Sequence, residues 1–312
     1  MLVQCPSSRP LSEAVWIDLF NPTDEERARV AEALGRRMPT KADLEEIESS
    51  SRAFVEAEAF YLSTPVLEGS DCRSDVLTTI GFVLSRKTLV TLRFARVAAL
   101  DAVEKTAGVE KLAASEVFLK ILEGIVDHTA DALEHASTDL EAISNEAFRS
   151  ERPKGQKLNQ ASDTQHAALR RLGRMADRIS RVRDTLLGTG RIAAFALEAD
   201  AEYRLASGTA ALQVVRRDVG SLTDYHLHLS GKVQFLLDAT LGFINIQQND
   251  IVKGLTIVSV VGVPPVLIVG IYGMNFKNMP ELDWTLGYPF ALILLVLSAL
   301  APLAWFKWRG WM

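Results

Sequence analysis

Two long stretches without a charged residue dominate the C-terminal part of the chain. One runs from Gly254 to Met274 and the other from Leu286 to Phe306, and each contains 21 residues. A helix of this length rises about 30 Å, which matches the thickness of the hydrocarbon core of a bilayer. The sequence therefore predicts a helical hairpin that crosses a membrane twice.

The rest of the chain has the composition of a water-soluble protein. Charged residues make up 23% of the 312 residues, and all but five of them lie at or before Lys253. This predicts one soluble part of about 200 residues in front of the hairpin. The net charge of −5 argues against nucleic acid as a partner, because phosphate contacts need clustered Lys and Arg side chains.

The distribution of basic residues predicts the orientation in the membrane. The first ten residues lack the charged start and apolar stretch of a secretory signal, so we expect the hairpin to direct insertion. Lys232 and Lys253 precede the first span, and Lys307 and Arg309 follow the second. The positive-inside rule then places both termini in the cytoplasm, with the loop outside, in a bacterial inner membrane.

Residues 1–112 are predicted to form an α/β domain. A helix is expected after Thr23, which has Glu26 three residues later as in a capping box, and a second helix from Lys41 to Ser50. Strands are expected at residues 15–19, 53–67, 76–84 and 88–94, where apolar and β-branched residues gather.

Residues 113–204 are predicted to be an antiparallel helical region, because apolar residues recur there at helical spacing. A break is expected at Pro153-Lys154-Gly155, and only a short helix after Gly188-Thr189-Gly190. An acidic helix would lie beside one rich in arginine, which favours ion pairs and a solvated face over a metal or phosphate site.

The following residues, 205–250, are predicted to form a stalk helix that continues into the membrane without a break. Such a helix is too long for one domain of this size to bury, so we expect it to pack against copies of itself. The remaining segments are a first span at 251–274, an external loop at 275–286, a second span at 287–306 and a basic tail at 307–312.

Two transmembrane helices cannot enclose an aqueous path, so transport would require several subunits around an axis. Steps of three and four along the first span define one candidate pore-lining face, which consists of Asn249, Val252, Leu255, Ser259, Val263, Val266 and Gly270. This face holds no carboxylate, so a passing cation would keep most of its water. Val252 and Leu255 would form a constriction that gates by dewetting. Ordinary helix packing is the alternative interpretation of these positions.

The loop after the first span adds polar groups at the outer end of this face. Asn275 offers an amide oxygen, and the carbonyl groups of Gly273 and Met274 lie next to it. A ring of such neutral oxygens can bind the water shell of a cation without holding the ion too tightly. Glu281 and Asp283 would concentrate cations near the entrance.

The sequence around this loop resembles the CorA family of divalent cation channels. The resemblance rests on Tyr272-Gly273-Met274-Asn275-Phe276, on Met279-Pro280-Glu281-Leu282, on Trp284 and on Gly287-Tyr288-Pro289. It extends to Asn249, Lys253, Leu255-Thr256, Pro264, Arg217-Asp218-Val219 and Trp16-Ile17-Asp18-Leu19, and so covers essentially the whole chain.

The resemblance implies a homopentameric funnel with a pore formed by the first span and an outer selectivity site for hydrated Mg²⁺ at Asn275. It also implies cytoplasmic carboxylates that bind Mg²⁺ between subunits and keep the pore closed. Asp218 matches one of these positions, and Glu45 and Glu46 match the other, with Glu46 where the family usually has aspartate. A surface salt bridge of Asp218 with Arg216 or Arg217 is the alternative, and a solvated helix face is the alternative for the two glutamates.

Two residues depart from the family pattern. Lys277 stands where glutamate is frequent and would place a positive charge near the entrance. Val266 stands where many relatives have a hydroxyl group, which removes one polar ring from the pore. Both changes concern conduction rate and ion choice more than the fold.

Other functions are compatible with parts of the sequence. A carrier of Zn²⁺, Co²⁺ or Ni²⁺ with the same fold, with or without proton coupling, is one alternative, and a non-conducting sensor or scaffold is another. An enzyme is not expected, because the chain lacks a glycine-rich phosphate loop, a Gly-x-Ser-x-Gly sequence and a His-Glu-x-x-His sequence. No organic cofactor is expected.

Overall fold

The computed structural model divides the chain into two compact units, Met1–Leu237 and Asp238–Met312. It describes residues 2–6, 10–46, 48, 52–69, 76–106, 111–148, 158–198, 208–275, 279–280 and 284–311. The break expected at Pro153-Lys154-Gly155 lies outside these residues.

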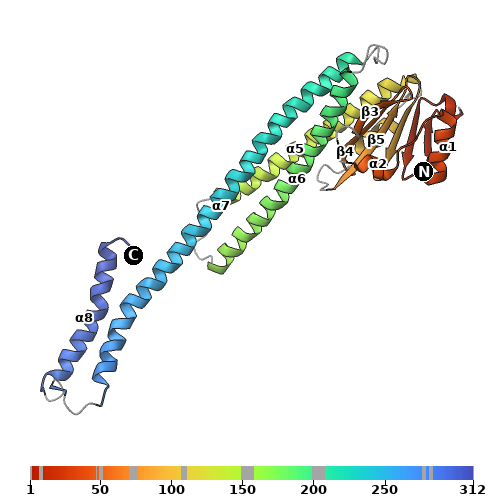
Figure 1. The fold of residues 1–312 in the computed structure, drawn as a ribbon. Helices are drawn as coiled ribbons and strands as arrows, with labels where there is room; N and C mark the ends of the chain where they lie inside the picture. Colours follow the sequence, from red (N-terminus) through yellow and green to blue (C-terminus); the bar gives the residue numbers. More distant parts are fainter. Residues whose placement is uncertain are drawn as a thin grey trace. The chain divides into compact units, whose positions relative to one another are not determined.

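A six-stranded sheet forms the N-terminal part of the first unit (Figure 1). Its strands are β1 (Leu2–Cys5), β2 (Trp16–Phe20), β3 (Ala53–Glu56), β4 (Ala59–Leu67), β5 (Leu77–Leu84) and β6 (Leu89–Arg93), in the spatial order β1-β2-β6-β5-β4-β3. Only the β2–β6 pair is parallel among these neighbours. The α/β character expected from the sequence is confirmed.

Helices surround this sheet and continue beyond it. They are η1 (Leu11–Glu13), α1 (Asp24–Leu34), α2 (Lys41–Glu45), α4 (Ala98–Glu104), α5 (Ala114–Phe148), α6 (Leu158–Glu198), α7 (Thr209–Tyr272) and α8 (Gly287–Trp308). The long uninterrupted helix expected to enter the first apolar run is α7, which contains 64 residues. The boundary between the two units falls within α7.

Local capping explains where the first two helices begin. Thr23 accepts a hydrogen bond from the Glu26 N–H, and the Glu26 carboxylate accepts one from the Thr23 N–H, which confirms the predicted capping box. Thr40 and Asp43 form the same arrangement at α2. The helix expected to reach Ser50 ends at Glu45, because Glu46 adopts an extended conformation with ψ of 138°.

The predicted strand at 53–67 is two strands. Ala57 and Glu58 have positive φ angles of 46° and 59°, and they form the turn between β3 and β4. Nothing in the sequence marks this turn, because neither residue is one that usually favours the left-handed region. Strand β1 and helix α4 were also not expected.

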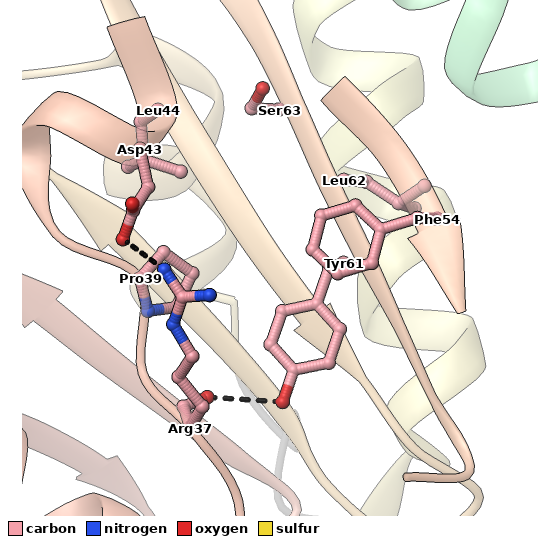
Figure 2. Close-up of a pocket in the computed structure, with 8 residues that line it drawn as sticks. All are labelled: Arg37, Pro39, Asp43, Leu44, Phe54, Tyr61, Leu62 and Ser63. Carbon is pink, nitrogen blue, oxygen red and sulfur yellow. Dashed lines mark hydrogen bonds and ion pairs between the residues drawn. The ribbon is translucent and has the colours of Figure 1, made fainter. Parts of the chain in front are cut away.

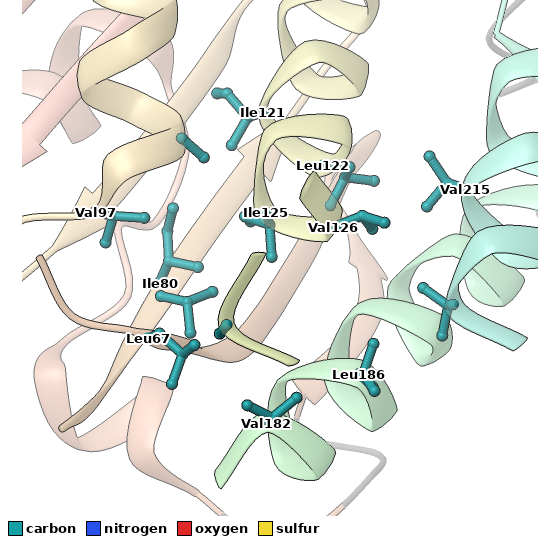
Figure 3. Close-up of a cluster of buried hydrophobic side chains, with 14 of the residues drawn as sticks. Leu67, Ile80, Val97, Ile121, Leu122, Ile125, Val126, Val182, Leu186 and Val215 are labelled. Atoms are coloured by element: carbon teal, nitrogen blue, oxygen red, sulfur yellow. The ribbon is translucent and has the colours of Figure 1, made fainter. Parts of the chain in front are cut away.

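The two faces of the sheet have separate apolar cores. On one face, α1 and α2 cover a cluster that includes Ile17, Leu19, Val30 and Leu44. On the other face, α4, α5, α6 and the first part of α7 complete a larger cluster, part of which Figure 3 shows. Its labelled members are Leu67, Ile80, Val97, Ile121, Leu122, Ile125, Val126, Val182, Leu186 and Val215. A single chain therefore closes both cores of the first unit.

Glycines allow α6 to approach the sheet closely. A Cβ atom at Gly188 would lie 2.2 Å from Thr64 Oγ1 and 2.9 Å from Pro65 Cδ, both on β4. A Cβ atom at Gly190 would lie 3.1 Å from a methyl group of Val219 on α7. The prediction of a helix break at Gly188-Thr189-Gly190 is therefore wrong: α6 continues to Glu198, and the glycines serve packing rather than termination.

A buried ion cluster ties β2, β6 and α4 together. Arg93 donates to Asp18 Oδ2 at 2.9 Å and to Asp101 Oδ1 at 2.5 Å. Asp18 also accepts a hydrogen bond of 2.6 Å from Thr91. Arg93 and Asp18 are almost completely buried, so each charge depends on its partner to offset the loss of water.

The second unit contains the end of α7 and all of α8. Both helices are long and apolar enough to cross a membrane, with mean hydropathy of 2.2 in their most apolar segments. Almost none of the residues in these segments is buried within the chain, at 0% for α7 and 6% for α8. The two helices lie alongside each other as a hairpin (Figure 1). The predicted pair of C-terminal apolar helices is thus confirmed.

Candidate functional site

The candidate pore-lining residues form one exposed face of α7. Val252, Leu255 and Val266 are 59%, 67% and 70% exposed in the single chain. The remaining members, Asn249, Ser259, Val263 and Gly270, are exposed as well. Their spacing of three and four residues keeps them on one side of the helix.

The opposite side of α7 faces its neighbour in the hairpin. Residues of intermediate exposure recur at Ile257, Val261, Pro264, Pro265, Ile268 and Tyr272. Ile268 and Tyr272 line a cavity of about 480 Å³ together with residues of α8. At 3.6 residues per turn, this set lies about half a turn from the candidate pore face. The candidate face therefore points away from α8 and is available to another subunit or to water.

Two consecutive prolines interrupt the hydrogen bonding of α7 within the apolar run. Pro264 and Pro265 have no N–H group, so the carbonyl groups of Val260 and Val261 lose their α-helical donors. The helix nevertheless continues to Tyr272.

The residues of the candidate selectivity site follow the end of α7 directly. The Gly273 N–H donates to the Val269 carbonyl at 2.9 Å, and the Met274 N–H donates to the Ile271 carbonyl at 3.2 Å. A Cβ atom at Gly273 would lie only 3.1 Å from the Val269 oxygen, so this turn has little room for a side chain. Gly273, Met274 and Asn275 are exposed. The charged loop residues Lys277, Glu281 and Asp283 lie outside the described residues.

The candidate regulatory glutamates lie at the end of α2 and are exposed. Glu45 pairs with Lys41 at 3.7 Å, and the backbone carbonyl of Glu46 accepts a hydrogen bond of 2.7 Å from Arg52 Nε. Among the described residues, the Glu46 carboxylate makes no hydrogen bond or ion pair, and the residue is exposed. Neither glutamate belongs to a core, so their side chains are available for binding.

An ion pair beside these glutamates fixes α2 against the sheet (Figure 2). Arg37 contacts Asp43 at 2.8 Å, and the Tyr61 hydroxyl on β4 donates to the Arg37 carbonyl at 3.1 Å. The Thr40 backbone N–H and the Arg37 guanidinium lower the pKa of Asp43. Sequence analysis missed these positioning residues, because Arg37 and Tyr61 are 24 positions apart and share no motif.

Asp218 is exposed on the first part of α7. Within the part of the chain that the structure describes, it forms no ion pair with Arg216 or Arg217, which removes support for the salt-bridge alternative. No hydrogen bond or ion pair joins Asp218 to Glu45 or Glu46 among these residues. Likewise, no three His, Cys, Asp or Glu side chains in the described ranges are grouped so that they could hold a metal ion.

Comparison with known proteins places this arrangement in a family. Residues 12–308 match the family described as "CorA-like Mg2+ transporter protein". The magnesium transport protein CorA of Escherichia coli K12 is 34% identical over 315 residues, which cover 99% of this chain and 96% of the relative. The chain belongs to the CorA family. The CorA protein of Salmonella typhimurium LT2 is also 34% identical, with the same coverage of both chains.

Solved structures share the fold. The complete structure of the CorA magnesium transporter from Methanocaldococcus jannaschii matches with a TM-score of 0.77 at 19% identity, over 95% of this chain and 91% of that one. The full-length CmaX protein matches with a TM-score of 0.70 at 16% identity, over 95% and 88% of the two chains. CorA membership confirms the resemblance and identifies a membrane transporter rather than an enzyme.

Proposed function

We propose that this chain forms a homopentameric membrane pore that takes up divalent cations, Mg²⁺ foremost, with α7 lining the axis. The observation that carries the proposal is the exposed α7 face opposite α8, which leads to Asn275. The magnesium transport proteins at 34% identity support Mg²⁺ as the ion. The bacterial inner membrane, with both termini cytoplasmic, is the location that fits the charge distribution.

The chemistry of the pore face favours passage of a hydrated ion. No carboxylate lies among its residues, and stripping water from Mg²⁺ without strong oxygen ligands is very costly. A ring of Asn275 amides, one from each subunit, would instead bind the water molecules around the ion. Five such weak contacts can select an ion and still release it.

The apolar residues nearer the cytoplasm provide the gate. Rings of Val252 and Leu255 form a constriction that loses water when it narrows. Mg²⁺ bound between Asp218 of one subunit and Glu45 and Glu46 of the next would hold the ring closed. When the ion leaves, like charges face one another and the constriction widens.

The membrane potential is sufficient to drive this uptake. A divalent ion gains about 4.6 kcal/mol for each 100 mV that it crosses, which is twice the value for a unit charge. No nucleotide hydrolysis is required.

Replacement of Asn275 tests the ion pathway. Asn275→Ala is expected to reduce Mg²⁺ uptake into proteoliposomes at least about tenfold, a loss of about 1.4 kcal/mol, because the amide ring is lost. Thr285→Ala in the same loop is the matched control and should transport normally. The pentamer should persist in both variants by size-exclusion chromatography with light scattering. Wild-type uptake by Asn275→Ala would refute the role of this residue.

The same vesicles separate the alternative functions. A competition series of Mg²⁺, Zn²⁺, Co²⁺ and Ni²⁺, with and without a pH gradient, identifies the preferred ion and any proton coupling. A preference for Zn²⁺ would show that Zn²⁺, and not Mg²⁺, is the substrate. The absence of flux for every ion at every internal Mg²⁺ concentration would favour a non-conducting scaffold.

Charge reversal on α7 tests the proposed regulation. Asp218→Lys is expected to raise the internal Mg²⁺ concentration needed for half-closure by about tenfold, because a carboxylate ligand is replaced by an ammonium group that repels the metal ion. Asp224→Lys, six residues further along α7 and also exposed, is the control. Equal inhibition of currents in Asp218→Lys and the wild type would contradict the regulatory role.

A further inference from the structure

A cavity of about 250 Å³ lies between α6 and α7 in the first unit, outside the proposed ion pathway. One wall comes from α6 and the other from α7, both at helical spacing. The lining residues are Ala176, Ile179, Ser180 and Arg183 on α6, and His226, Ser230, Val233, Gln234 and Leu237 on α7. The site already described uses none of them.

One of the residues that line this cavity is a buried histidine. His226 is only 5% exposed, and it contacts the backbone of Ile179 on the opposite helix. Its Nε2 atom lies 3.4 Å from the Ser230 hydroxyl, which also lines the cavity. Burial, and secondarily the nearby charge of Arg183, lower the pKa of His226, so the ring is neutral at pH 7.

The polar groups that line this cavity can all donate hydrogen bonds, and the single formal charge among them is positive. Ser180, Arg183 and Gln234 are exposed, so they stand where a ligand enters from solvent. Arg183 supplies the one formal charge among the lining residues, and none of these residues is a carboxylate. Arg183 forms no ion pair within the described ranges of the chain. A cation would meet repulsion and no anionic ligand here, whereas an anion would meet a guanidinium group, two hydroxyl groups and an amide.

We propose that this cavity binds a small tetrahedral oxyanion of the phosphate class, held by Arg183 and by the hydroxyl and amide donors of both helices. A tetrahedral oxyanion presents acceptors in several directions, which suits donors that converge from two walls, and a guanidinium group binds such an anion through two parallel hydrogen bonds. The bound anion bridges α6 and α7 and therefore stabilises their contact. The volume also admits a phosphate group attached to a small organic molecule.

Binding is tested on the full-length detergent-solubilised protein in Mg²⁺-free buffer, so that phosphate cannot act through a metal. Inorganic phosphate is expected to bind in isothermal titration and to raise the thermal midpoint. Arg183→Gln should weaken this binding at least about tenfold, because the only charged donor is removed. Arg174→Gln, an exposed arginine on the same helix but outside the cavity, should bind phosphate as the wild type does.

A second variant separates a local site from general attraction to a basic helix. Ser180→Ala removes an exposed neutral donor of the same cavity without changing charge, and it should weaken phosphate binding severalfold while leaving the phosphate-free thermal midpoint close to wild type. Parallel titrations with adenosine monophosphate distinguish a phosphomonoester from free phosphate as the preferred ligand. Equal phosphate affinity in the wild type, Arg183→Gln and Arg174→Gln, or no binding to the wild type at millimolar phosphate, would overturn the proposal.

Discussion

The two units of this chain treat their apolar residues in opposite ways. In the first unit, Phe82, Phe118 and Ile121 are fully buried, and the helices on each side of the sheet close a core from one polypeptide. In the second unit, Leu255 and Val266 are mostly exposed although the segment is more apolar. The first unit completes its cores within one chain, whereas the second leaves its apolar surface uncovered by the rest of the chain.

The largest expected effect concerns the buried ion cluster of the first unit. Arg93→Met leaves Asp18 buried without its counter-charge, and we expect a loss of about 3–5 kcal/mol in the free energy of unfolding. Arg27→Met removes an exposed pair with Asp24 and should cost no more than about 1 kcal/mol. Denaturation followed by circular dichroism measures both. A loss for Arg93→Met as small as that for Arg27→Met would show that the buried cluster does not hold this unit together.

Glycine substitutions compare the two units directly. Gly188→Ala places a methyl group against Thr64 and Pro65, and overpacking of this kind costs about 1–3 kcal/mol. In contrast, a Cβ atom at Gly262 in the second unit meets no other atom within 4 Å in the single chain, so Gly262→Ala should leave the first unit unaffected.

Oligomer size and thermal midpoint are measured for Gly188→Ala and Gly262→Ala, so that the effects on the two units can be compared. Gly173→Ala on the same helix as Gly188 is the control, because the space around Gly173 is open. It is expected to stabilise α6 by about 0.5–1 kcal/mol, in line with helix propensity. Loss of the oligomer in Gly262→Ala without any change in the first unit would locate a subunit contact on α7.

The smallest expected effect is a pH dependence of the α6–α7 contact. The folded-state pKa of His226 is lowered, so the unfolded chain binds a proton more readily than the folded one. The contribution of His226 to the free energy of unfolding is fully present above a pH of about 6.5, the ordinary pKa of histidine. It falls as the pH drops below that value. Arg183 is the charged group that faces the ring from α6 and disfavours its protonation.

The difference between wild-type and His226→Gln thermal midpoints isolates this contribution between pH 5 and pH 8. Other titrating groups contribute equally to both proteins. The wild type should lose stability relative to the variant as the pH falls. A difference that stays constant over the whole range would contradict the predicted pKa direction.

What the sequence predicted correctly depends on local or strongly periodic signals. The apolar runs of α7 and α8 are continuous, and the Thr23–Glu26 capping box spans four residues. What it missed depends on contacts between distant residues. Gly188 looks like a helix breaker until its approach to Thr64 on β4 is known, and the turn at Ala57-Glu58 has no glycine or proline to mark it.

The candidate site shows the same difference between local sequence signals and contacts of distant residues. The positions of the α7 face follow from helical spacing, so their common orientation was predictable from Asn249 to Gly270. The hydrogen bond from Tyr61 to the Arg37 carbonyl, beside the Arg37–Asp43 pair, could not be predicted, because it requires the path of the chain between α2 and β4. The binding roles of Asn275 and Asp218 stay predictions that the experiments above test, and the role of Glu46 also stays a prediction.

The adjacent prolines of α7 have a consequence for how a bilayer accommodates this helix. Two backbone oxygens, at Val260 and Val261, need donors at a depth where lipid tails offer none. Pro264 and Pro265 lie on the side of α7 that faces α8, so this gap in the hydrogen bonding opens mainly toward the hairpin and not toward the candidate pore face. The hairpin must therefore satisfy these two acceptors itself, through local adjustment of the helix, polar groups or enclosed water.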